Sequence, residues 1–124
     1  MTMRTNDLKK LIQTKLKTVT SLVYHEIADE KALYPHIVFG FDRIDLEDLS
    51  RQDYVLVIDV WDKGNSTTQV DDLAESVENL LQAENLPQEN ILPTFYLMDE
   101  HNVRDEDKAI KHKQIRFQIQ NYDR

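Results

Sequence analysis

The chain has no cysteine among its 124 residues, and it has only two glycines and three prolines. Without cysteine it can form neither a disulfide framework nor a thiolate metal site. Two glycines are too few for a glycine-rich loop that cradles phosphate. No run approaches the ~20 apolar residues of a membrane-spanning helix, and the N-terminus lacks the apolar stretch of a signal peptide. These absences predict a soluble, intracellular protein with no membrane partner, made of a single domain over residues 1–124.

Charge is unevenly distributed along the chain, whose formal net charge is -8. Residues 1–19 carry five Lys/Arg and one acid, and residues 108–124 repeat that balance. Residues 42–107 carry four Lys/Arg and eighteen Asp/Glu. An acidic middle argues against sequence-specific nucleic-acid binding, which needs a concentrated basic surface. The basic ends of one subunit could instead meet the acidic middle of another, or all of them could be solvated surfaces.

Two amphipathic helices are predicted. The first follows Asn6 as its N-cap and places apolar residues at helical spacing from Leu8 to Val19, with lysines on its exposed side. The second runs over residues 68–84, capped by one of the hydroxyl residues at 66–68 and ended by the segment that contains Pro87.

Two segments between these helices read as strands. Pro35 favours an extended backbone before it, and residues 37–41 alternate between two faces. Residues 54–61 are apolar on both faces except at Asp59, which predicts a central strand buried on two sides. Gly40 within the first strand suggests a bulge or the close approach of another backbone.

The remaining pattern predicts a short strand near residues 22–27, a strand at 94–98 and a last strand through 115–119. Residues 42–53 and 99–108 read as polar connections, the second as an acidic hairpin loop. The predicted fold class is therefore α+β, with a mostly antiparallel sheet of four to five strands and two amphipathic helices packed on one face.

Catalytic chemistry finds little support. The four histidines lack metal-ligand spacing and read as surface residues. The triplet Glu106-Asp107-Lys108 fits half of a metal-dependent nuclease site, for which Asp99 or Asp59 could supply the second carboxylate. That triplet lies in a polar turn of an acidic chain, a poor place for a rigid site that handles nucleic acid. We therefore expect no enzyme, no cofactor and no bound metal.

The residues that favour assembly are the candidate interface. Asp59 is either a functional carboxylate or the partner of a basic or hydroxyl side chain, and Trp61 is either an interface anchor or the cap of the core. Arg116 and Gln118 face away from the apolar side of the last strand, toward water or a polar partner. The candidate interface residues are Gly40, Asp59, Trp61, Arg116 and Gln118.

The order of these elements resembles the tail-completion, or tail-terminator, family of long-tailed bacteriophages and phage-derived elements. The resemblance covers nearly the whole chain, including the second helix and the closing strand. It rests on fold-bearing residues: Tyr34, Pro35, Ile37, Val38, Gly40, Val57, Ile58, Val60, Trp61, Arg116, Phe117 and Gln118.

This resemblance implies a structural morphogenesis protein that forms a hexameric ring on the tail tube, ends tube polymerisation and joins tail to head. The implied partners are other copies of the chain, the tail tube protein and the head connector or head-closure protein. The subunit would be in the host cytoplasm during assembly, as a monomer before the ring forms, and then at the tail-head interface of the virion. A head-closure protein or a tail-assembly chaperone is the alternative, followed by a small nuclease.

Overall fold

The computed structural model describes residues 4–28, 30–46, 51–82 and 91–123, which form two helices and five strands. In chain order these are α1 (Arg4–Leu16), β1 (Val23–His25), β2 (His36–Leu46), β3 (Arg51–Lys63), α2 (Thr68–Leu81), β4 (Ile91–Val103) and β5 (Ile110–Asp123). Neither helix in these residues has the length and apolar character needed to cross a membrane.

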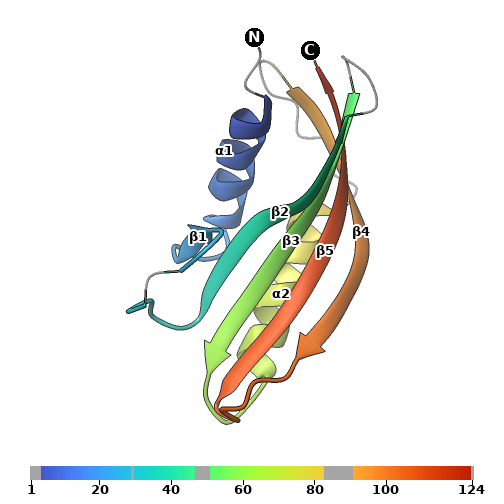
Figure 1. Cartoon of the computed structure of the whole chain (residues 1–124). Coiled ribbons are helices and arrows are strands. Elements are labelled where there is room, and N and C mark those ends of the chain that lie inside the picture. The colour runs from blue at the N-terminus through green and yellow to red at the C-terminus, as the bar shows by residue number, and fades with distance from the viewer. Residues whose placement is uncertain (1–3, 29, 47–50, 83–90, 124) are drawn as a thin grey trace.

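The strands form one sheet in the order β1-β2-β3-β5-β4 (Figure 1). All neighbouring pairs are antiparallel except β1 and β2, which run parallel. The sheet is curved, and α1 contacts both of its edge strands, β1 and β4, while α2 packs against β3, β5 and β4. The predicted α+β class, with two helices and a mostly antiparallel sheet, is confirmed.

The core lies between the helices and one face of the sheet, which we term the covered face. Along β3 the residues of this face alternate with those of the other, as the pleat of a strand requires. On the covered face, Leu56, Ile58 and Val60 of β3 are fully buried. Ile115, Phe117 and Ile119 of β5 are fully buried beside them and belong to the same hydrophobic core. The helices supply matching apolar stripes: Leu8, Leu11, Ile12 and Leu16 from α1, and Val70, Ala74, Val77 and Leu81 from α2.

Both helix starts differ in detail from the prediction. Helix α1 begins at Arg4, so Asn6 lies inside the helix and is not its cap. The first turn is tied to the sheet instead, because the Thr5 hydroxyl lies 3.1 Å from the Tyr54 hydroxyl. Helix α2 has Thr67 at its N-cap position without a side-chain cap bond, while the Ser66 hydroxyl accepts a hydrogen bond from the Thr68 amide at 3.1 Å.

Two segments predicted as connections are partly strand, so the predicted bounds were wrong. β2 continues through Leu46 and β3 already begins at Arg51; residues 47–50 lie outside the described residues. β4 runs on to Val103, so the acidic segment after residue 98 pairs with β5 over about half its length. Most described side chains of both extensions are exposed, including Asp42 and Arg43 of β2 and Glu100 and His101 of β4, and strand pairing tolerates such residues because it uses only the backbone.

The prediction that both faces of β3 are buried was also wrong for the single subunit. β3 is central, third of five strands, but only its covered face is packed by helices. Its other side chains, including Val55, Val57 and Trp61, are only half-buried. We term this side of the sheet the open face.

Candidate interface on the open face of the sheet

The five predicted interface residues all lie on the open face. Strand register places Gly40 of β2 opposite Val57 of β3, and Val57 opposite Arg116 of β5. The neighbouring rows hold Asp59 and Gln118, because pairing across antiparallel strands keeps partners on one face. The structure therefore brings these residues together, while their role in binding stays a prediction.

Gly40 does not form a bulge. The register shift in β2 lies one position later, between Phe41 and Arg43. A Cβ added at Gly40 would meet the Glu26 backbone Cα at 4.0 Å, which is ordinary van der Waals contact. The segment after β1 thus approaches the open face at Gly40, and the Glu26 amide donates to the Phe39 carbonyl at 2.8 Å.

Asp59 is bonded to two side chains of β5. Its Oδ1 lies 2.6 Å from His112 Nε2 and accepts a hydrogen bond from Gln114 Nε2 at 3.1 Å. Both partners are adjacent to it across the β3–β5 pairing, so the network is held by strand register. Of the alternatives for Asp59, pairing with a basic side chain is the one the structure shows.

Trp61 lies in a row of three rings across β2, β3 and β5. Its indole stacks on the His112 imidazole with centroids 3.7 Å apart and planes 14° apart, and His36 follows on the other side at 6.4 Å. Burial lowers the pKa of His36, whose Nδ1 lies 3.0 Å from the Leu33 carbonyl oxygen. The reading of all four histidines as surface residues was therefore wrong for His36 and His112, which are largely shielded from water.

Arg116 is held in place by Asp99 of β4. Its Nε lies 3.0 Å from Asp99 Oδ1 and its Nη2 lies 2.5 Å from Asp99 Oδ2, so the two side chains form a bidentate ion pair. This bond lowers the pKa of the Asp99 carboxyl and raises that of the guanidinium. Arg116 thus presents a fixed, planar edge on the open face beside Val57.

Neither carboxylate proposed as the second metal ligand of a nuclease site is available in this geometry. Asp59 is bonded to His112 and Gln114, and Asp99 is bonded to Arg116. In the triplet itself, Asp107 accepts the Ala109 amide at 2.9 Å within the β4–β5 turn. Across the residues that the structure describes, no three His, Asp or Glu side chains are grouped as a metal site would need.

Sequence comparison identifies the family. The profile described as "Tail completion protein gp17" matches residues 8–120, which is nearly the whole chain. The chain belongs to the tail-completion protein family. It is therefore a structural protein of a phage-type tail, and the predicted resemblance is confirmed. A search of curated protein sequences finds no match.

Structural comparison gives a consistent result. A chain of a particle described as "Virion of native gene transfer agent (GTA) particle" superimposes with a TM-score of 0.66, covering 90% of this chain and 91% of that one. At 12% sequence identity this likeness shows a shared fold. The shared fold includes the sheet that carries the open face, since the alignment spans almost all of both chains.

Sequence reasoning missed the partners of the predicted residues. The structure shows His112 and Gln114 bonded to Asp59, His112 stacked on Trp61, and Asp99 bonded to Arg116, and the sequence predicted none of these pairs. The missing signal was register: once Trp61 pairs with His112, the positions of the other partners follow from alternation.

Proposed function

We propose that this tail-completion protein caps the tail tube as a ring, ends tube polymerisation and joins the tail to the head. The family match over residues 8–120 carries the proposal, and the open face supplies its physical basis. The proposed partners are further copies of the chain, the tail tube protein and the head-closure or connector protein.

The open face has the properties of a protein contact surface. Val55, Val57 and Trp61 are half-buried and uncovered by any described helix, while their neighbours on the covered face are fully buried. Apolar side chains mixed with fixed polar groups are typical of protein interfaces, where charges are few at the centre and aromatic and Arg residues are common. Arg116, bonded to Asp99, and Asp59, bonded to His112, are such fixed polar groups.

A ring of identical subunits also needs two unlike surfaces that fit each other. The basic residues 1–19 and the acidic residues 42–107 give the chain such a contrast. In the structure, α1 carries the first on one part of the surface, and the sheet and its connections carry most of the second. This contrast favours head-to-tail assembly over a closed dimer of like surfaces.

The test is a tube-length experiment with purified proteins. Tail tube protein polymerises alone or with this chain, and tube lengths are measured by electron microscopy. We expect capped tubes of limited length that bind connector rings at one end. Val57→Asp, which places a charge in the open face, should abolish capping, whereas Asn79→Asp on the exposed side of α2 should cap normally.

Three results separate the alternatives. Tubes that grow equally long with and without the wild-type protein would overturn the proposal. Binding to tape-measure protein without incorporation into particles would identify a tail-assembly chaperone. Binding to the head connector without any effect on tubes would identify a head-closure protein.

A further inference from the structure

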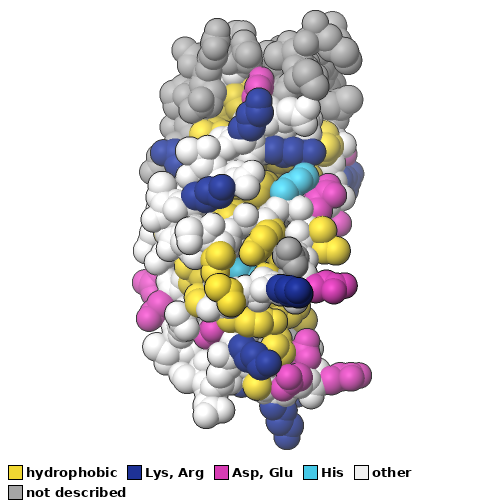
Figure 2. Space-filling model, turned by 90° about the vertical axis from the view of Figure 1, so that its left-hand side faces the viewer, with side chains coloured by type: hydrophobic (Ala, Val, Ile, Leu, Met, Phe, Trp, Pro, Cys, Tyr) yellow, Lys and Arg dark blue, Asp and Glu magenta, His cyan; other side chains and the backbone are white. Residues whose placement is uncertain are grey.

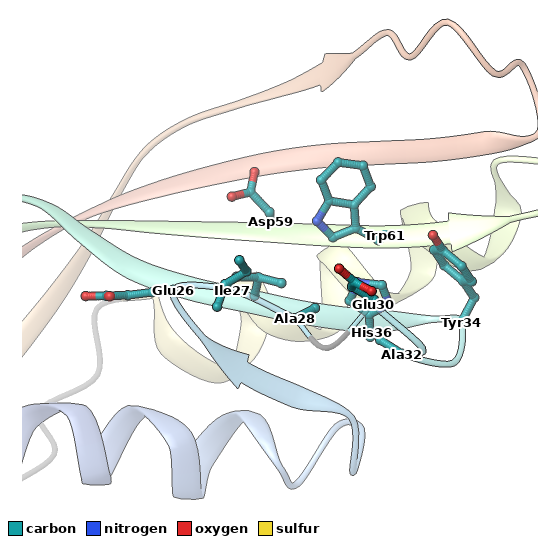
Figure 3. A pocket seen from close by; sticks show the side chains of 10 residues that line it. Glu26, Ile27, Ala28, Glu30, Ala32, Tyr34, His36, Asp59 and Trp61 are labelled. Carbon is teal, nitrogen blue, oxygen red and sulfur yellow. The ribbon is translucent and has the colours of Figure 1, made fainter.

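A pocket opens on the open face beside β1. Its volume is about 350 Å³, within the size range of ligand pockets. One wall is the segment that leaves β1, and the floor is formed by β2 and β3 (Figure 3). The lining residues described are Glu26, Ile27, Ala28, Glu30, Ala32, Tyr34, His36, Val38, Asp59 and Trp61.

The chemistry of this pocket suits a cation. Three of its lining side chains are carboxylates: Glu26 and Glu30 are exposed, whereas Asp59 is bonded to His112 and Gln114. No described lining residue is a lysine or arginine. The Tyr34 and Trp61 side chains both line this pocket (Figure 3), and the face of an aromatic ring attracts an ammonium group placed over it. An aromatic pocket with acidic groups recognises a positive charge better than an apolar or anionic group.

The rim of the pocket is apolar and strongly exposed. Ile27 is 80% exposed, Leu33 on the same connection is 70% exposed, and Tyr34 is 41% exposed. Such side chains cover the hydrocarbon stem of a long cationic residue while its charged end reaches the carboxylates. The pocket and its rim together therefore fit a lysine or arginine side chain presented by another protein surface.

The chain itself carries a matching surface. Helix α1 and the residue after it carry Lys9, Lys10, Lys15 and Lys17, of which Lys10 and Lys17 are exposed and the other two are half-buried. Within the part of the chain that the structure describes, none of these four lysines forms an ion pair. Figure 2, which faces the side of the molecule where α1 and β1 lie, shows basic side chains gathered above a band of hydrophobic ones.

We propose that the pocket receives a lysine of α1 from a second copy of the chain. The proposal rests on the ring of the proposed function and identifies one of its subunit contacts. Charge complementarity selects the occupant: the pocket is lined by three carboxylates, and α1 with the residue after it exposes Lys10 and Lys17, which have no ion pair among the described residues. The two surfaces are different parts of one chain, as a head-to-tail contact requires.

A charge-swap experiment tests this contact. One variant carries Glu26→Lys and Glu30→Lys in the pocket, and the other carries Lys10→Glu and Lys17→Glu on the helix. All four positions are at the surface, so folding should be retained. Each variant alone places like charges opposite each other, and we expect self-association to weaken by about ten-fold or more.

An equal mixture of the two variants should restore assembly. In an alternating arrangement, every lysine-substituted pocket meets a glutamate-substituted helix, and every native pocket meets a native helix. Native mass spectrometry in solution and on capped tube ends reports the assembly and the alternation. This rescue also shows that both variants are folded, since an unfolded partner could not take part.

Matched controls make the same charge changes elsewhere. Glu75→Lys with Glu106→Lys, and Lys63→Glu with Lys108→Glu, alter exposed positions outside the pocket and α1. We expect both controls to assemble like the wild type.

The inference is overturned if the pocket and helix variants assemble as well as the controls, or if mixing them restores nothing. That result is distinct from failure of the proposed function. Wild-type protein that leaves tubes uncapped contradicts the function, whereas capping by wild type together with unaffected variants contradicts only the pocket contact.

Discussion

Between Tyr54 and Trp61 both faces of β3 are mostly apolar, yet only one is covered by helices. Leu56, Ile58 and Val60 are fully buried under the helices, whereas Val55 and Val57 on the opposite side are half-buried. Two helices supply enough apolar surface for one face of a five-stranded sheet. The apolar side chains of the open face are thus not covered by the two helices, and we propose that another protein contacts them.

The polar residues of the two faces differ as well. On the open face, Asp59, His112 and Gln114 satisfy one another across the sheet. On the covered face, Asn121 Nδ2 donates to Gln52 Oε1 at 2.9 Å, and the remaining amide atoms of this pair have no partner among the described residues. The open face is therefore arranged to stay ordered without a cover, while the covered face depends on its packing.

The largest test of this contrast is a truncation on the covered face. Ile58→Ala removes a fully buried side chain and leaves a cavity, so we expect a loss of about 2–5 kcal/mol in the free energy of unfolding. Urea denaturation followed by circular dichroism measures it. A loss as small as that of an exposed position would show that the helices do not pack on this face as described.

The buried amide pair gives the next effect. Asn121→Ala leaves the Gln52 amide buried without its partner, at an expected cost of about 1–3 kcal/mol. The double variant with Gln52→Leu should recover part of this loss, because two apolar side chains leave no unpaired group. Equal stability of Asn121→Ala and the wild type would mean that the bond contributes nothing.

Truncation of a side chain on the open face should lower the free energy of unfolding by less than Ile58→Ala or Asn121→Ala does. Val57→Ala removes a half-buried side chain that no helix contacts, so the expected loss of unfolding free energy is below about 1 kcal/mol. Val57 and Ile58 are consecutive residues of β3, so a difference between the losses caused by Val57→Ala and Ile58→Ala reflects which face each side chain lies on. If both truncations cost the same, the contrast between the faces is wrong.

The smallest effect concerns pH. Burial, and then a hydrogen bond with Glu100, raises the pKa of Glu78 to about 7. The folded chain therefore binds this proton more tightly than the unfolded chain, and stability rises as the pH falls from about 7 toward the ordinary value of 4.5. Glu78→Gln should flatten this rise and stabilise the fold at neutral pH by about 0.5 kcal/mol after solvent screening.

Thermal unfolding between pH 4.5 and 7.5 checks the Glu78 prediction. Below this window the trend reverses, because the pKa of Glu100 is lowered by the bond with Glu78 and that of Asp99 is lowered by Arg116. A variant with the pH profile of the wild type would show that Glu78 does not carry the effect.

Periodicity was sufficient for much of the fold. The apolar stripes of α1 and α2 and the alternation in β2, β3 and β5 each reflect burial against one partner layer. The extensions of β2 and β4 were missed because their side chains are charged and exposed, so that nothing in their pattern distinguishes a paired strand from a loop. Their extended conformation depends on pairing with a neighbouring strand, which the local sequence does not show.

The candidate site was predictable in its members but not in its geometry. Alternation alone placed Asp59 and Trp61 on one face of their strand, and Arg116 with Gln118 on one face of theirs. That these faces coincide, and that His112 joins Asp59 to Trp61, depends on the β3–β5 register. The apolar content of β3 suggested burial on both sides because a sequence does not show which apolar face of a strand is covered by helices.

The absence of cysteine permits the most direct measurement of the central claim, that the open face is a docking surface. A single thiol introduced by Val57→Cys can be labelled in the free protein and again on capped tail tubes, with Glu75→Cys on the exposed side of α2 as the control. We predict that labelling of position 57 slows by about ten-fold or more on tubes while position 75 is unchanged, as burial in an interface requires. Equal labelling of position 57 in the free and the tube-bound protein would contradict the account.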